Sequence, residues 1–192
     1  MRIYILIIAA FTLGACTLKP VETVYHEEKD FTRFTTKAII TKTGSKEIEL
    51  VASKECPGKV ICTDQEIKLK VTHKDRFSLL KGKDLVLEAD QDKLDLNERD
   101  YSNSYDMNKI AKDGTDGVLN EQFLIWVSES DFRKAAYSQS VIMKVGDDSF
   151  ELSIEERNSW QIMLDKERLL EIMDEEQQRE YGLYTHERKD KK

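Results

Sequence analysis

Short segments in which apolar and polar residues alternate constrain the fold of this chain more than any other feature. In residues 66–72, for example, three apolar residues alternate with charged and polar ones. Successive side chains of a strand point to opposite faces of a sheet, so each such segment predicts a strand with one buried and one solvated face. Sheets with one solvated face are typically antiparallel.

Turn residues join these segments into hairpins. The predicted strand pairs lie on either side of residues 43–45, 90–93 and 146–148. The most apolar segment, residues 119–127, predicts a central strand, because a strand buried on both faces loses the alternation. The polar residues 97–117 predict a long loop, with a short strand or a helical turn around residues 107–111 as the alternative.

Capping residues indicate three helices. Residues 75–82 and the residues from Ser130 onwards each begin with a good N-cap and predict two short helices. Ser153 followed by Glu156 matches a capping box, from which a long helix is expected to run to about Tyr181. The fold class expected is therefore α+β, with an antiparallel sheet packed by two short helices and a long C-terminal helix.

The two halves of this expected domain, at about residues 34–105 and 118–181, share the order strand, short helix, strand, turn, strand. Apolar residues of the two halves match at spacings of 55 or 56 residues, as Val71 does with Val127. The match suggests an internal duplication of a strand-helix-strand-strand unit, although apolar strands also match by chance.

The N-terminus has the composition of a secretory signal peptide, with one positive charge at Arg2 and an apolar run over residues 3–11. This run is shorter than the about 20 apolar residues that a membrane-spanning helix needs. It leads into Leu13-Gly14-Ala15-Cys16, which closely resembles the lipobox of bacterial lipoproteins. The resemblance implies removal of residues 1–15 and acylation of Cys16, which would anchor the protein to the lipid bilayer of the cell envelope.

The remaining chain is expected to consist of three parts. Residues 16–33 predict a lipidated tether, with a docked strand around Val24 as the alternative. Residues 34–181 predict a single α+β domain, and residues 182–192 a charged tail. Because Thr17 is not the aspartate that resembles an inner-membrane retention signal, we expect the outer membrane if the source has one, facing either the periplasm or the surface.

The charge of the chain limits its partners. The formal net charge of −7 disfavours nucleic acids and anionic lipid headgroups. Attachment to the membrane is therefore expected to come from the acyl chains of the lipid anchor.

The two cysteines that follow Cys16 are expected to form a disulfide. Cys56 and Cys62 flank Pro57-Gly58, which is a strong turn signal. Outside the cytoplasm such a pair usually oxidises. Chain entropy predicts a stabilisation of about 2 kcal/mol for a ring of this size.

No catalytic motif or cofactor-binding motif is present in the sequence, and we expect neither a cofactor nor a bound metal. The best candidates for a cation site are Asp90, Asp92 and Asp95, but their spacing departs from that of an EF-hand loop. A solvated hairpin is the favoured interpretation of these residues.

Four aromatic residues are candidates for a binding surface, because aromatic side chains anchor interfaces. They are Tyr101, Tyr105, Trp126 and Tyr137. For Trp126, which lies inside the apolar segment 119–127, burial in the core is the expectation.

The expected C-terminal helix is one-sided beyond Asp165, where Leu169, Ile172 and Met173 share a face. This stripe either covers the protein's own sheet or forms a ridge for a partner or a second copy of the chain. Residues 174–192 are expected to contribute little to the stability of the fold.

The predicted location and the missing catalytic motifs favour a non-enzymatic module that binds or assembles with an envelope protein, or with a second copy of itself. The alternative is a small envelope enzyme or enzyme inhibitor, whose site would be built from loops such as residues 97–117.

Overall fold

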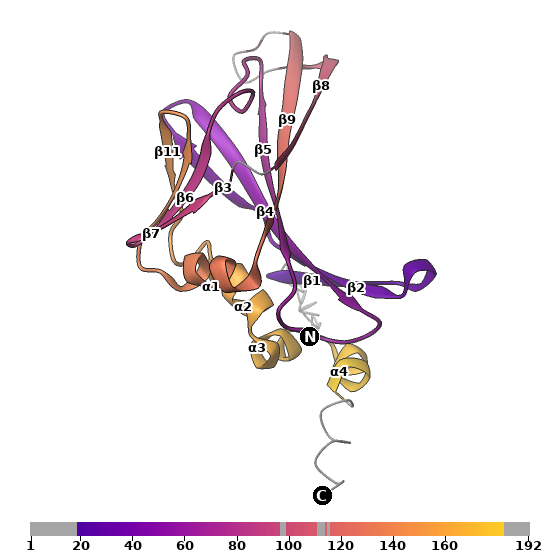
Figure 1. Cartoon of the computed structure of the whole chain (residues 1–192). Helices are drawn as coiled ribbons and strands as arrows, with labels where there is room; N and C mark the ends of the chain where they lie inside the picture. Colours follow the sequence, from indigo (N-terminus) through magenta and orange to yellow (C-terminus); the bar gives the residue numbers. More distant parts are fainter. Residues whose placement is uncertain (1–18, 97–98, 111–113, 115, 183–192) are drawn as a thin grey trace, which may run out of the picture.

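Antiparallel strands form most of the structure, and short helices lie together at one end of it (Figure 1). The computed structural model describes residues 19–96, 99–110, 114 and 116–182. Its elements in chain order are β1 (Val21–His26), the 3-10 helix η1 (Glu27–Lys29), β2 (Phe31–Thr36), β3 (Ile39–Thr43), β4 (Lys46–Pro57), β5 (Ile67–Asp75), β6 (Leu85–Ala89), β7 (Asp92–Asp95), β8 (Arg99–Ile110), β9 (Asp116–Val127), α1 (Glu129–Tyr137), β10 (Val141–Val145), β11 (Asp148–Glu151), α2 (Asn158–Leu164), α3 (Lys166–Glu171) and α4 (Glu175–Gly182). The expected α+β class is confirmed in this broad sense.

The larger sheet has the order β1-β2-β4-β5-β9-β8, and β3 pairs with β4 beyond the end of β2. All of its strand pairs are antiparallel. The hairpin predicted around residues 43–45 is confirmed as β3 and β4, with Gly44 at a φ of +59°, which glycine adopts without strain. The predicted strand at residues 119–127 is confirmed within β9, which lies between β5 and β8, but its burial on both faces is not, because side chains on its outward face are half-buried or exposed.

The smaller sheet has the order β11-β10-β6-β7. Both of its outer strand pairs are predicted hairpins, β6 with β7 around Asp90 and β10 with β11 around residues 146–147. Its inward side chains and those of the larger sheet share one hydrophobic core, which extends in sequence from Val21 to Tyr181. Strand β11 lies beside β3 and so brings the two sheets together.

The pairing registers of the two sheets share a regularity. Leu69 of β5 faces Ile125 of β9, and Leu87 of β6 faces Met143 of β10, so that in both pairs the partners are 56 residues apart. The outer neighbours of these strands correspond as well. In the larger sheet β4 lies beside β5 and β8 lies beside β9, and in the smaller sheet β7 lies beside β6 and β11 lies beside β10.

The expected tether is wrong from Val21 onwards, because this part of the chain forms β1 and β2, which pair with each other across a turn at Asp30. Val21 and Phe34 are buried in the core, as the alternative interpretation of a docked strand requires. Other inward positions carry Thr32 and Thr36, whose hydroxyl groups form hydrogen bonds with the backbone of neighbouring segments. Buried threonines conceal the apolar alternation that marks a strand.

The expected loop at residues 97–117 is also wrong over Arg99–Ile110, which form β8. This strand pairs with β9 along one side and is the last strand of the sheet. Most of its side chains are exposed, and an edge strand with solvent on both faces needs no apolar alternation.

The first short helix, expected at residues 75–82, does not form. Strand β5 continues to Asp75, and residues 76–82 form bends and turns. The backbone N–H groups of residues 79–81 donate to the carboxylate of Glu121 on β9. A buried acceptor from a distant part of the chain therefore sets the conformation of this segment, and local propensity does not.

The long C-terminal helix is replaced by three short helices. Asp165 has an extended backbone that ends α2, and its carboxylate accepts hydrogen bonds from the N–H groups of Glu167 and Arg168 as the N-cap of α3. Asp174 likewise accepts from the N–H of Gln177 in the first turn of α4. Aspartate favours N-caps over helix interiors because its carboxylate competes for backbone N–H groups.

The second expected short helix is α1, but its N-cap is Ser128 and not Ser130. Its C-terminal end is held by the buried Arg157, whose guanidinium donates to the carbonyl groups of Ala135 and Ala136. Burial lowers the pKa of this guanidinium. A buried cation therefore replaces water at the negative end of the α1 dipole.

The capping box of Ser153 and Glu156 is confirmed. The N–H of Ser153 donates to the Glu156 carboxylate, and the N–H of Glu156 donates to Ser153 Oγ. These bonds stabilise a turn that precedes the helix, because α2 begins only at Asn158.

Candidate functional site

The predicted lipidation site, Cys16, lies outside the described residues, of which Lys19 is the first. Strand β1 begins two residues later, at Val21. No helix in the described ranges is long and apolar enough to cross a membrane. Acylation of Cys16 therefore stays a prediction.

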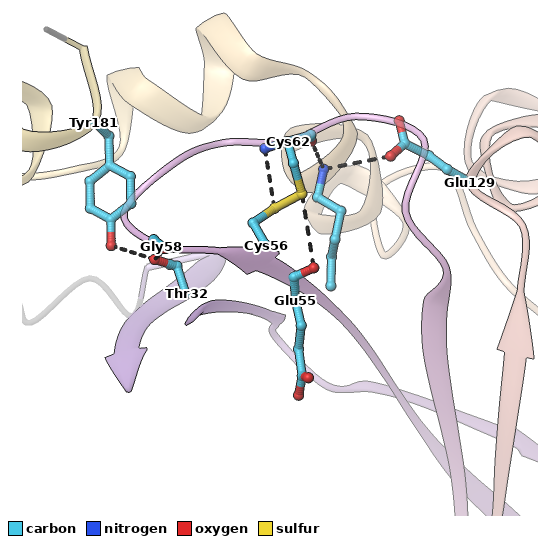
Figure 2. The surroundings of a disulfide bond; sticks show 8 residues. Thr32, Glu55, Cys56, Gly58, Cys62, Glu129 and Tyr181 are labelled. Carbon is cyan, nitrogen blue, oxygen red and sulfur yellow. Dashed lines mark hydrogen bonds and ion pairs between the residues drawn. A yellow bond between two sulfur atoms is a disulfide. The ribbon is translucent and has the colours of Figure 1, made fainter. Parts of the chain in front are cut away.

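The predicted disulfide between Cys56 and Cys62 is confirmed, with Cα atoms 5.5 Å apart (Figure 2). Two neighbouring elements hold the ring that it closes. The carbonyl of Gly58 accepts a hydrogen bond of 2.7 Å from Thr32 on β2, and the Thr32 hydroxyl lies 2.9 Å from the Tyr181 hydroxyl on α4. The disulfide ring thus connects the N-terminal strands with the C-terminal helix.

A buried ion pair lies beside this ring. Lys54 is only 2% exposed, and its Nζ donates to the Cys62 carbonyl at 3.0 Å and lies 3.7 Å from Glu129 Oε2. Burial lowers the pKa of Lys54, although the Glu129 carboxylate partly opposes this shift. Because the amine is sealed from solvent, the pair holds the ring against the start of α1 and presents no nucleophile to a substrate.

The acidic residues of the β6–β7 hairpin do not converge on a cation site. The Asp90 carboxylate accepts hydrogen bonds from the N–H groups of Ser140 and Gln139, which lower the pKa of Asp90. Asp92 and Asp95 lie at opposite ends of β7. No group of three potential metal ligands occurs among the residues that the structure describes. Asp90 instead connects the hairpin to the segment before β10.

The residues of the predicted docking ridge mostly belong to the protein's own core. Leu169 and Met173 are buried, and the half-buried Ile172 packs against the same core. Of the two interpretations of this stripe, Leu169 and Met173 therefore follow the one in which it covers the domain itself, and they do not form a docking ridge. Tyr181 of α4 is also buried, so residues 174–182 contribute more to the fold than expected, and the rest of the predicted tail lies outside the described residues.

Trp126 is 46% exposed, so the expectation that it lies in the core is wrong. Its neighbours in the strand, Ile125 and Val127, face the core, and alternation therefore turns Trp126 outward. Lys68 of β5 lies opposite it, with Nζ 5.7 Å from the centre of the indole ring. The other candidate aromatic residues lie apart from it on β8 and α1: Tyr101, Tyr105 and Tyr137.

The edge of β8 is the first candidate surface. The strand is twelve residues long, and its outer edge has no strand partner among the described residues (Figure 1). Tyr105, Met107 and Ile110 are 53%, 68% and 70% exposed. The Tyr105 ring rests on the backbone of Gly117, where a Cβ atom would collide with it. Such an open edge is the surface to which an extended segment adds as a further strand.

The second candidate surface lies on the outward face of β4, β5, β9 and β8. Two neighbouring rows of polar side chains cross these strands, and we call them the polar face. One row is Glu49, Thr72, Gln122 and Ser102, and the next is Lys74, Asn120 and Ser104. Together with Lys70 they line a hollow of about 440 Å³. Sequence analysis missed this surface, which offers amide, hydroxyl and ammonium groups.

Glu121 lies behind the polar face and is fully buried. Its carboxylate accepts hydrogen bonds from Ser78 Oγ at 2.6 Å, from the Tyr101 hydroxyl at 2.7 Å and from three backbone N–H groups of residues 79–81. Burial alone would raise the pKa of Glu121, but the hydrogen bonds outweigh it, and the pKa lies below its ordinary value. A carboxylate occupied in this way anchors the loop and is not available as a general base.

Comparison of the chain with known protein families, with characterised proteins and with solved structures finds no match. Two surfaces of the protein are therefore the candidates for its function, the edge of β8 and the polar face.

Proposed function

We propose that the protein is a lipid-anchored, non-enzymatic binding module of the bacterial envelope, and that the edge of β8 receives an extended segment of a partner protein. The observation that carries the proposal is the length and exposure of this edge. The added strand would pair with the free backbone groups of β8, and its side chains would contact Tyr105, Met107 and Ile110.

The other sheet edges are shorter or partly covered. Strand β7 has four residues, and β11 is held against β3 and β4, where Thr41 donates to the Glu151 carbonyl and Lys46 pairs with Asp148. The segment before β1 is joined to the residue that precedes α4 by the ion pair of Lys19 with Asp174. Proteins usually protect long strand edges, so an open edge of twelve residues favours a binding role.

The position of β1 supports an orientation on the membrane. Only residues 17–20 separate Cys16 from β1, and an extended chain covers about 3.5 Å per residue. A lipid on Cys16 would therefore hold the start of β1 within about 17 Å of the bilayer. The hairpin of β8 and β9 extends away from α3 and α4 (Figure 1), so the open edge would project away from the membrane.

We also propose that the two halves of the domain arose by internal duplication. The main support is the strand order, in which β4, β5, β6 and β7 occupy the same relative places as β8, β9, β10 and β11. Each of the two central ladders also contains one pair 56 residues apart, Leu69–Ile125 and Leu87–Met143. The two halves differ in the segments that connect their strands. In the first half the disulfide ring follows β4, and in the second half the helix α1 follows β9.

Photo-crosslinking in intact cell envelopes tests the binding role. A photoreactive amino acid in place of Met107 on β8 should form an adduct with one partner protein, because this side chain lies beside the added strand. The control places the same group at Lys29, which is exposed in η1. Equal adducts from both positions, or none from β8, would contradict the proposal.

Two proline variants sharpen this experiment. Backbone N–H groups of adjacent strand residues point to opposite sides, so only one of Asn103→Pro and Ser104→Pro removes a hydrogen bond to β9. The other variant removes only a donor of the open edge, and it should stay folded but lose the adduct. In the same strain, Cys16→Ser should leave a signal-bearing precursor that lacks the acyl-dependent part of detergent partitioning, and a processed protein that still carries a lipid label would contradict the predicted anchor.

A further inference from the structure

We infer that the polar face is a second binding site, which takes a linear acidic polysaccharide and recognises its hydroxyl and carboxylate groups. This inference is independent of the role proposed for the β8 edge. It concerns the outward side chains of β4, β5, β9 and β8, whereas strand addition uses the backbone of β8.

Thr72 is the residue that points to a ligand. It is only 9% exposed, and its hydroxyl has no hydrogen-bond partner within the described part of the chain. A buried hydroxyl without a partner costs stability, and few persist in folded proteins without a reason. Thr72 lies on the outward side of β5 in the lining of the hollow. The hydroxyl oxygen itself is sealed from solvent in this conformation, so a ligand oxygen in the hollow would complete its hydrogen bonding once the Thr72 side chain rotates to another rotamer.

The neighbours of Thr72 suit a ligand rich in hydroxyl groups. Gln122 lies directly opposite Thr72 on β9, and Ser102 lies opposite Gln122 on β8. Asn120 occupies the next row. Amide and hydroxyl side chains both donate and accept hydrogen bonds, as sugar hydroxyl groups do.

The charges of this face favour an anionic ligand, although the whole chain carries a net charge of −7. Lys68, Lys70 and Lys74 all project from the outward side of β5. Lys74 pairs with Glu49 at 3.4 Å, whereas Lys70 has no hydrogen-bond or ion-pair partner in the residues that the structure describes. An acidic sugar would place its carboxylate near Lys70.

The shape of the surface favours a linear polymer. The outward residues of β9 form a line from Asn120 through Gln122 and Leu124 to Trp126, which spans about 20 Å at the rise of a strand. The exposed indole ring at its end offers a flat apolar surface to the face of a sugar ring. Nucleic acid is disfavoured by the net charge, and a peptide of acidic residues lacks the hydroxyl groups that the amides match.

Fluorescence of Trp126 reports on this site, because the second tryptophan, Trp160, is fully buried. We would titrate the full-length protein in detergent with alginate oligosaccharides, which are linear polyuronates, and measure binding by fluorescence and calorimetry. A saturable signal that weakens with salt is expected with alginate, because charge contacts are screened. Neutral dextran should give no signal.

Thr72→Val separates a binding role from a structural one. The hydroxyl has no partner in the free protein, so its removal should leave the unfolding free energy unchanged or raise it. The affinity for alginate should nevertheless fall by about fivefold or more. Lys70→Gln should have a similar effect, and Lys29→Gln is the matched control that should have none.

Four outcomes would overturn the inference. The first is no saturable binding of alginate at low salt. The second is equal affinity for polyglutamate, which would make the surface a site for acidic peptides. The third is an equal loss of affinity in Lys29→Gln and Lys70→Gln, and the fourth is a Thr72→Val variant that is less stable but binds alginate unchanged.

Discussion

At Glu121, one buried carboxylate determines the path of a whole loop. Three backbone N–H groups of residues 79–81 converge on it, so the segment between β5 and β6 folds around an acceptor instead of forming a helix. Arg157 does the reverse at the end of α1, where a buried guanidinium donates to backbone carbonyl groups. Single polar residues therefore fix segments that lack a strong apolar pattern.

Glu121→Gln should lower the free energy of unfolding by about 2–3 kcal/mol at pH 7, because an amide cannot accept from all of the donors around the carboxylate. Since the pKa of Glu121 is lower in the folded protein, its contribution is present above the unfolded pKa and is lost as the pH falls through the folded pKa. Urea denaturation across the acidic range should show the two proteins converging. The exposed Glu151→Gln variant is the control, and equal stability of Glu121→Gln and wild type at pH 7 would refute the role.

At the scale of elements, apolar alternation predicted the strands that have one buried and one solvated face, as in residues 66–72. Alternation did not predict β2, where threonines such as Thr32 fill inward positions. It also did not predict β8, because side chains on both faces of that strand are exposed to solvent. The apolar period runs across Asp165, so it also concealed the break between α2 and α3.

The candidate surfaces were predictable only in part. The outward position of Lys68 and Lys70 follows from the alternation of β5. The row that joins Thr72 to Gln122 and Ser102 depends on strand order, which no local pattern encodes. The apolar run around Trp126 likewise gave no indication of which of its side chains face outward.

Removal of the disulfide should loosen two distant elements together. The double variant Cys56→Ala, Cys62→Ala should lose about 2 kcal/mol of stability, because the ring no longer restricts the unfolded chain. Proteolysis within α4 should also become faster, since the Gly58–Thr32–Tyr181 contacts depend on the ring. Tyr181→Phe should reproduce the faster proteolysis with a smaller loss of stability. A double variant with unchanged urea unfolding and unchanged cleavage would contradict this account.

At the scale of the whole molecule, the two proposed surfaces meet at β8. Its free edge would receive an extended partner segment, and its outward side chains Ser102 and Ser104 complete the polar face. A strand added to β8 would therefore widen the polar face by one strand. The predicted anchor lies close to β1, while the hairpin of β8 and β9 extends away from α3 and α4 (Figure 1).

Amide hydrogen exchange of residues 99–110 tests the binding role of β8 most directly. The purified protein in detergent and the protein in intact cell envelopes would be compared peptide by peptide. We predict that the edge amides of β8 exchange about tenfold or more slowly in envelopes, because an added strand would protect them, whereas the amides of β1 exchange alike in both. Equal exchange of β8 in the two preparations would contradict the account.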